Sequence, residues 1–305
     1  MKFFQKIKAK KPVLLVGWPG MGNVALGSVD YLRRHLKATP FAQIDMSDYS
    51  IPDSIVISSG VAQLPEFPKS IFYYTPQPEI VFFESEIQIG GKGGITLIQE
   101  VLNLAEELKV RRIYAGAAFP SPTSHREPSL VFGATNKPNL KDWLTGFDVG
   151  IMQGGHISGL NGLILGYAAQ RKIEAICLLA TMPLYAINLP NPKASKAIIG
   201  ILSRMIGFKV DMFEIDQGIV EMAGQMEMVE EKMWEVFSGM REEQMKPPEL
   251  DDTKTPDHIL QKIERLFEEA KQDKQKAYLL KEELDRWDLY KEYGDRFLDL
   301  FKESE

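Results

Sequence analysis

The chain has 305 residues, 44% of them hydrophobic and 26% charged, which is ordinary for a globular protein of one large or two smaller domains. A net charge of −6 argues against a general nucleic-acid binder. The single cysteine, Cys177, excludes a disulfide framework and a multi-cysteine metal site. No stretch approaches the roughly 20 apolar residues of a membrane span, and the N-terminus lacks the apolar core of a secretory signal. We therefore expect a cytoplasmic protein with neither nucleic acid nor membrane as a partner.

Apolar runs alternate with helical patterns through the first two thirds of the chain. Leu26, Val29 and Leu32 recur at three- and four-residue steps, which predicts an amphipathic helix. The predicted elements, in chain order, are strand 12–18, helix 23–37, short strands within 40–90, helix 95–108, strands at 111–119 and 129–135, a strand–loop–helix at 150–172, strand 173–183 and helix 191–208. Such alternation predicts an α/β fold with a mixed, mostly parallel sheet covered by helices on both faces, which we assign to residues 1–218.

The remaining residues, 219–305, differ in charge and periodicity. They hold 24 acidic and 14 basic residues, whereas residues 1–218 hold 18 and 22. A first helical pattern ends near Met245, three prolines interrupt it over 246–256, and a second, near-heptad pattern follows. We expect an acidic helical hairpin or coiled-coil tail.

Three glycine-rich loops join predicted strands to helices, and they are the candidate ligand-binding sites. The first, WPGMGN after Gly17, does not match the G-x-G-x-x-G spacing of dinucleotide folds or a P-loop. Its structural alternative is a tight turn, and the same alternative applies to the other two loops. The second is GGKGG (90–94), and the third is QGGHISGLNG (153–162). The candidate residues are Gly17, Pro19, Gly20, Gly22 and Asn23 of the first loop, Lys92 of the second, and Gly154, Gly155, Ser158, Gly159 and Asn161 of the third.

Catalytic and metal-binding patterns are weak. Ser158 follows His156, but it lacks the G-x-S-x-G spacing of a nucleophile elbow and is better interpreted as a helix N-cap. SPTSHREP (121–128) bunches polar residues, yet neighbours in an extended segment point to opposite faces, so a polar loop is expected. Histidine spacings typical of zinc sites are absent. We therefore assign no catalytic residue, no metal and no cofactor, and an enzyme is the less favoured interpretation.

Methionines are concentrated at the start of the tail, with six of 13 between Met222 and Met245. A methionine stripe is often core, but its flexible, polarizable surface also suits partner binding. The candidate partner-binding residues of the tail are Met222, Met226, Met233, Met240, Leu280, Leu284, Trp287 and Phe301.

Three segments together resemble the PAC2 family, which is named for a proteasome assembly chaperone. They are VLLVGWPGMGNVA, GGHISGLNGLILGYAAQRKIEAICLLATMP and NPKASKAIIGILSRMIGF, and the resemblance covers about residues 10–215. It implies an α/β body similar to purine nucleoside phosphorylase and homo-oligomers that in some members bind proteasome subunits. That binding uses a C-terminal hydrophobic-Tyr-x tripeptide, whereas this chain ends Glu303-Ser304-Glu305. Family members have also been labelled ATP-grasp-like.

Three functional hypotheses follow. The first is a non-catalytic, self-associating PAC2-family protein, such as a proteasome assembly chaperone, whose body forms the oligomer interface and whose tail contacts partners. The second is a nucleotide-, nucleoside- or phosphate-binding enzyme that uses the glycine loops. The third is a scaffold whose tail forms a coiled coil. We favour the first.

Overall fold

The computed structural model describes the chain except for residues 51, 246–256, 273–275, 288 and 301–305. Its contacts form two compact units, 1–236 and 237–305. Residues 219–236 of the predicted tail therefore pack with the α/β body. Among the described residues, no helix is both long and apolar enough to cross a bilayer.

A nine-stranded mixed sheet forms the centre of residues 1–236, in the order β1-β3-β6-β7-β2-β8-β11-β9-β10. Its middle strands β7, β2, β8 and β11 run parallel, whereas β1, β3, β6 and β9 are attached by antiparallel pairing. The strands are β1 (Lys2–Phe3), β2 (Val13–Gly17), β3 (Thr39–Ile44), β6 (Ser70–Pro76), β7 (Glu79–Ser85), β8 (Arg112–Ser121), β9 (Val131–Thr135), β10 (Gly150–Ile151) and β11 (Glu174–Pro183). The predicted mixed α/β sheet is confirmed.

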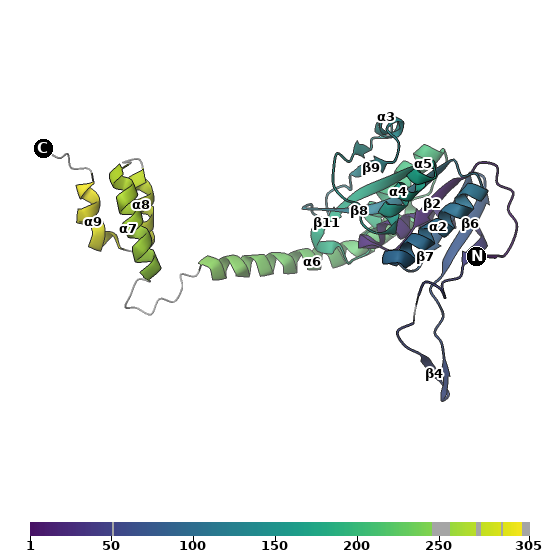
Figure 1. The fold of residues 1–305 in the computed structure, drawn as a ribbon, viewed down its shortest axis with the longest axis horizontal. Helices are drawn as coiled ribbons and strands as arrows, with labels where there is room; N and C mark the ends of the chain where they lie inside the picture. The colour runs from purple at the N-terminus through teal and green to yellow at the C-terminus, as the bar shows by residue number, and fades with distance from the viewer. Residues whose placement is uncertain (51, 246–256, 273–275, 288, 301–305) are drawn as a thin grey trace. The chain divides into compact units, whose positions relative to one another are not determined.

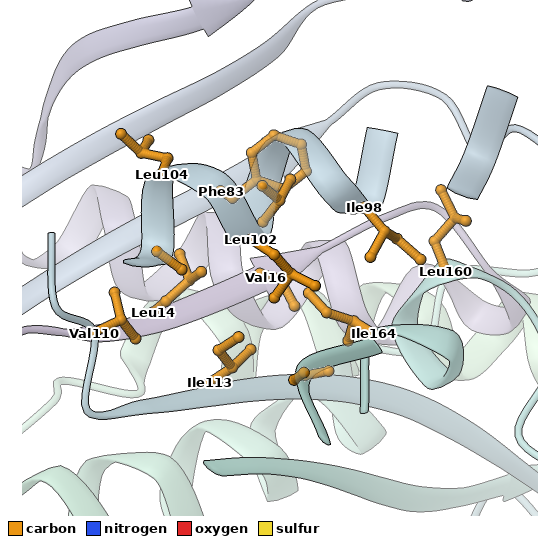
Figure 2. Close-up of a cluster of buried hydrophobic side chains, with 14 of the residues drawn as sticks. Leu14, Val16, Phe83, Ile98, Leu102, Leu104, Val110, Ile113, Leu160 and Ile164 are labelled. Atoms are coloured by element: carbon orange, nitrogen blue, oxygen red, sulfur yellow. The ribbon is translucent and has the colours of Figure 1, made fainter. Parts of the chain in front are cut away.

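Helices cover both faces of this sheet (Figure 1). On one face lie α2 (Gly91–Glu107) and α4 (Leu160–Gln170), and on the other lie α1 (Val24–His35), α3 (Asn139–Thr145) and α5 (Pro192–Ile206). Because side chains alternate along a strand, Leu14 and Val16 of β2 enter the first core, while Leu15 enters the second. Figure 2 shows Leu14 and Val16 with Ile98 and Leu102 of α2.

A separate two-stranded ribbon interrupts the connection between β3 and β6. It consists of β4 (Val56–Ser58) and β5 (Val61–Gln63), which pair only with each other. Figure 1 shows β4 near the tip of a segment that leaves the main sheet. None of its residues is buried.

The long helix α6 (Phe213–Met245) follows α5, and α7 (Asp257–Gln272), α8 (Ala277–Arg286) and α9 (Tyr290–Asp299) lie in the second unit. The second, near-heptad pattern of the tail, expected as part of a helical hairpin or coiled coil, corresponds to three short helices among the described residues. Ile263, Phe267 and Leu280 are fully buried among them. These helices therefore bury the predicted apolar seam in a core of their own.

Candidate functional site

The first glycine loop is joined to the start of α4 by one buried side chain, Asn161. Its Oδ1 accepts the backbone N–H of Trp18 at 3.1 Å, and its Nδ2 donates to the carbonyl of Trp18 at 3.0 Å. Trp18 itself is fully buried against Phe83, so it belongs to the core. The first and third predicted loops thus meet, because the amide of Asn161 hydrogen-bonds to both the N–H and the carbonyl of Trp18.

Gln88, which lies two residues before the second loop, reaches the same place. Its Oε1 accepts the backbone N–H of Leu160 at 3.3 Å, at the start of α4. The N-cap of α4 is Gly159, at φ 76°, where a Cβ atom would lie 2.6 Å from Gln88. The N-cap predicted at Ser158 is wrong, because a residue of another loop supplies the capping oxygen and Ser158 is exposed.

Gly22 ties the first loop to the segment that enters α5. It lies at φ 62°, and a Cβ there would lie 2.8 Å from the sulfur of Met182. Its N–H donates to the carbonyl of Ile187 at 2.8 Å, and its carbonyl accepts the N–H of Asn191 at 2.7 Å. Both backbone groups of this glycine are therefore used inside the protein.

The remaining candidate ligand residues do not converge. Lys92 is exposed in the first turn of α2, which begins at Gly91, four residues before the predicted start. Gly20, Asn23, Gly154 and Gly155 are also exposed, and Pro19 is half-buried. Moreover, β10 pairs parallel with β9 but runs opposite to the central strands β2, β8 and β11, so the third loop does not follow one of the central parallel strands as expected. At the junction of the first loop with α4, the glycines Gly22 and Gly159 instead allow close packing of the protein's own atoms.

A cavity of about 420 Å³ lies elsewhere on the same edge, beyond the ends of β8 and β11. The loop after β8, the start of α5 and one face of α6 enclose it. On α6, Ile219, Met222, Ala223 and Met226 repeat at three- and four-residue steps, so a single helix face lines the cavity. The other lining residues are Thr123, Ser124, His125, Arg126, Glu127, Pro128, Ser129, Thr181, Pro183, Asn191, Pro192, Lys193 and Glu227.

Lys193 holds the polar wall of this cavity together. Its ammonium group donates to the carbonyl of His125 and, at 3.2 Å, to that of Glu127. Burial lowers the pKa of Lys193, because removing water disfavours the charged form. The start of α5 is capped by Asn191, whose Oδ1 accepts the N–H of Ala194 at 2.9 Å.

His125 connects this wall to α6 and to the loop after β11. Its Nδ1 lies 3.0 Å from Oε2 of Glu230 and 3.0 Å from the hydroxyl of Tyr185, and its backbone N–H donates to the same hydroxyl at 2.9 Å. The side chain of His125 is only 8% exposed. Burial, together with the carboxylate of Glu230, raises the pKa of Tyr185. The cluster is a buried attachment point for α6.

Arg126, the next residue, also reaches α6. It pairs with Glu227 and, at 3.4 Å, with Glu230. SPTSHREP forms the expected polar loop, but both His125 and Arg126 reach α6, because the segment turns here, with the N–H of Glu127 donating to the carbonyl of Ser124, instead of running extended. Two features of the sequence could have indicated the site. The loop carries the basic side chains His125 and Arg126, and Glu227 and Glu230 lie three residues apart on one face of α6.

The predicted partner-binding residues of the tail fall into separate places. Met222 and Met226 line the cavity, and Met233 is half-buried. Leu280 and Leu284 are fully buried among α7–α9, and Trp287 packs against them. The side chain of Met240 and all of Phe301 lie outside the described residues. Their predicted role in partner binding stays a prediction.

Within the described part of the chain, no three His, Cys, Asp or Glu side chains gather closely enough to hold a metal ion. Cys177 is fully buried in β11, and burial raises its pKa to about 12, so the thiol stays protonated at neutral pH. The structure thus offers a packed junction and a cavity as its two candidate sites.

Comparison with known proteins connects this fold to a family. The family model described as PAC2 family matches residues 14–233. The chain belongs to the PAC2 family. The matched range ends within α6, so the cavity and the helix face that lines it lie inside the PAC2 region.

Similar proteins span most of this PAC2 chain. An uncharacterized protein of Methanocaldococcus jannaschii is 26% identical over 258 residues, which cover 81% of this chain and 95% of that protein. The crystal structure of Pyrococcus furiosus PbaB, an archaeal proteasome activator, matches with a TM-score of 0.64 and 22% identity, over 75% of this chain and 97% of that one. P. furiosus PbaA, an archaeal homolog of proteasome-assembly chaperone, matches with a TM-score of 0.61 and 20% identity, over 79% and 97%. At these identities the structural matches show a shared fold.

Proposed function

We propose that this PAC2 protein is a non-catalytic assembly factor that binds proteasome subunits and associates with itself. The observation that carries the proposal is the fold shared with PbaB, an archaeal proteasome activator, and with PbaA, an archaeal homolog of proteasome-assembly chaperone. A homologue of proteasome-assembly chaperone from Mycobacterium tuberculosis has the same fold, with a TM-score of 0.58 at 20% identity.

The glycine loops support a protein-binding role more than a nucleotide-binding role. A phosphate cradle needs free backbone N–H groups at a helix start. Here the N–H groups of Trp18, Gly22 and Leu160 are donated to other protein groups. These three donors are therefore not available to a phosphate.

An apolar surface on α6 is a suitable contact for a protein partner. Phe213 and Val220 are 68% and 75% exposed, and their seven-residue spacing puts them on nearly one side of the helix. This surface differs from the Met222 side, which lines the cavity. Large apolar side chains in water typically mark interaction sites when they group together.

Binding of purified full-length chain to the α and β subunits of a proteasome core particle tests the proposal. We expect co-purification, and we expect Val220→Glu to weaken it at least about tenfold, because a charge would be buried in the contact. Gln225→Glu adds the same charge to another exposed side of α6 and should change binding less than about twofold. Failure of the wild-type chain to bind any core subunit would contradict the proposal.

A thermal-shift titration tests the enzyme alternative independently. A bound ligand must raise the unfolding temperature by mass action. With ATP and with inorganic phosphate as probes, we expect no shift. A saturable shift that Gly22→Val or Lys92→Ala abolishes would favour a nucleotide or phosphate site at the glycine loops instead.

A further inference from the structure

Helix α6 spans the cavity of about 420 Å³ instead of packing on the body along its whole length. Ile215 and Met226 are 7% and 6% exposed, so the helix packs closely at both of these positions. Ile219 and Met222 lie between them on the same helix face, at steps of three and four residues, yet both stay only half-buried. Their apolar side chains line the cavity, which separates this part of α6 from the body.

Polar contacts attach α6 on either side of this gap. Near the start of the helix, Glu214 pairs with Arg34 of α1 at 2.7 Å. Beyond the gap, Glu230 lies 3.0 Å from the buried ring of His125. Because the helix is attached at both positions, the cavity between them is pre-formed. Small-molecule sites are usually pre-formed as well, with volumes of about 300–1,000 Å³.

The cavity lies where α/β sheets commonly bind small molecules. Strands β8 and β11 pair in parallel up to Ser121↔Pro183. Pro183 and the loop that follows β8 line the cavity, which places it beyond the carboxyl ends of two neighbouring strands. Ligands of open α/β sheets bind outside these ends. The position and the volume therefore both suit a small ligand.

The polar wall of the cavity has a hydrogen-bond donor that can still be used. Lys193 is half-buried at the start of α5, and its ammonium group donates to the carbonyls of His125 and Glu127. An ammonium group has three N–H bonds, so two carbonyls leave one N–H for a further acceptor. Both carbonyls are neutral, so they do not balance the charge of the ammonium group.

The charges around the cavity favour an anionic ligand. Besides a histidine, four charged side chains line it among the described residues, and two of them, Arg126 and Glu227, pair with each other. Glu127 is exposed, and its Oε1 already accepts the N–H of Ser124 at 3.1 Å. Lys193 is more buried than Glu127 and forms no ion pair within the described part of the chain. A partly buried cation of this kind is stabilised by an anion beside it.

We propose that this cavity binds a small amphipathic carboxylate, with the carboxylate on Lys193 and the apolar chain along Ile219 and Met222 of α6. A methionine side chain is flexible and polarizable, so it can adapt to the shape of such a chain. The inference goes beyond the proposed function, because it assigns a small-molecule ligand to the cavity side of α6 and not to the side that carries Phe213 and Val220.

Isothermal titration calorimetry of the full chain with octanoate tests this site. Octanol and octylammonium are matched probes, because they carry the same chain with a neutral or a cationic head group. We expect saturable binding of octanoate, at least about tenfold tighter than that of either control, since a charge-assisted hydrogen bond to Lys193 requires the carboxylate. Equal binding of all three probes would overturn the preference for an anion. Absence of saturable octanoate binding at millimolar concentration would overturn the site.

Ala223→Leu fills the cavity from α6 and leaves the polar wall intact. We expect octanoate affinity to fall at least about tenfold, because the added side chain occupies the space of the ligand, while the unfolding temperature stays equal or rises. Gly224→Leu is the matched control, since residue 224 is exposed and has open space around its Cβ position. It should change octanoate affinity less than about twofold. Octanoate affinity that survives Ala223→Leu would place the ligand elsewhere.

Lys193→Met tests the charged contact, because methionine keeps much of the side-chain length and lacks the charge. We expect octanoate affinity to fall at least about tenfold and octanol affinity to change less than about threefold. Circular dichroism checks that the variant keeps the fold without the hydrogen bonds to His125 and Glu127. An equal loss for both probes would overturn Lys193 as the partner of the carboxylate.

Hydrogen exchange locates the bound probe and separates this inference from the proposed function. Octanoate should slow exchange of the amides in 219–226, and slowing confined to the glycine loops would overturn the cavity as the site. Val220 lies on another side of α6, so Val220→Glu should bind octanoate within about twofold of wild type. Failure to bind proteasome subunits would leave this result unchanged, and failure to bind octanoate would leave subunit binding unchanged.

Discussion

Two regions on one edge of the PAC2 sheet differ in how they use their backbone groups. At the junction of the first glycine loop with α4, Asn161 and Gln88 occupy backbone donors, and Gly22 packs against Met182. Beside α5 and α6, a loop without a glycine motif leaves a cavity of about 420 Å³.

A glycine-rich sequence therefore does not by itself predict a cavity that could hold a ligand. At Gly22 a side chain would clash, so glycine there makes room for the protein's own atoms. The cavity instead arises where α6 spans a gap between the loop after β8 and the start of α5. A glycine pattern thus indicates close backbone approach, and what approaches depends on the rest of the fold.

Replacing Gly22 with valine should have the largest effect on this comparison. Valine must adopt φ near 62° and its Cβ must displace the Met182 side chain. We expect the free energy of unfolding to fall by about 2–4 kcal/mol. Urea denaturation measures it. Gly154→Val, at an open position of the third loop, should cost less than about 1 kcal/mol, and equal losses in both variants would contradict the packing interpretation.

The pH dependence of stability should come from Glu84 of β7, which pairs in register with Gly17 of β2, next to the first glycine loop. Burial raises the pKa of Glu84 to about 7, although Arg33 lies 2.7 Å away. The folded state then holds this proton more tightly than the unfolded state. The free energy of unfolding should therefore fall by roughly 1–3 kcal/mol as pH rises from about 4.5 to 7, and level off above.

Glu84→Gln cannot titrate, so it isolates this contribution. The difference in unfolding free energy between wild type and variant should change across the same pH window. A constant difference from pH 4.5 to 8 would show that Arg33 keeps the carboxyl at its ordinary pKa.

The smallest effect concerns the cavity side, where two neighbouring residues attach α6. His125→Ala removes a buried contact to Glu230 and should cost about 1–2 kcal/mol. Arg126→Ala removes a pair whose arginine is 62% exposed and should cost less than about 0.5 kcal/mol. Hydrogen exchange of the amides in 213–233 measures both. Faster exchange in Arg126→Ala than in His125→Ala would reverse the assignment.

Local patterns were enough to predict the main elements of the body. The helix predicted at 23–37 is α1 (Val24–His35), and the strand predicted at 173–183 is β11 (Glu174–Pro183). Both predictions rest on periodicity, which burial on one or both faces imposes directly. The glycine run at 90–94 led to a helix start predicted too late, because α2 already begins at Gly91 despite the low helix propensity of glycine.

The candidate site was harder to predict, since it depends on contacts far apart in sequence. His125 meets Glu230, and Gln88 replaces Ser158 as the cap of α4. Sequence spacing can show which residues share a helix face, as it did for Met222 and Met226, but it does not show which loop that face meets. The near-heptad seam of the tail likewise cannot distinguish one long helix from three short ones that fold on each other.

The two hydrogen bonds of the Gly22 peptide make one wall of the cavity dependent on the turn after β2. Because this residue bonds to both Ile187 and Asn191, the first turn of α5 takes its position from the β2 turn directly. A shift of that turn by a few tenths of an ångström would thus be passed to the opening of α5 without any strand moving. Substitution at residue 22 is therefore limited both by the space beside Met182 and by the segment from Ile187 to Asn191 that hydrogen-bonds to its backbone.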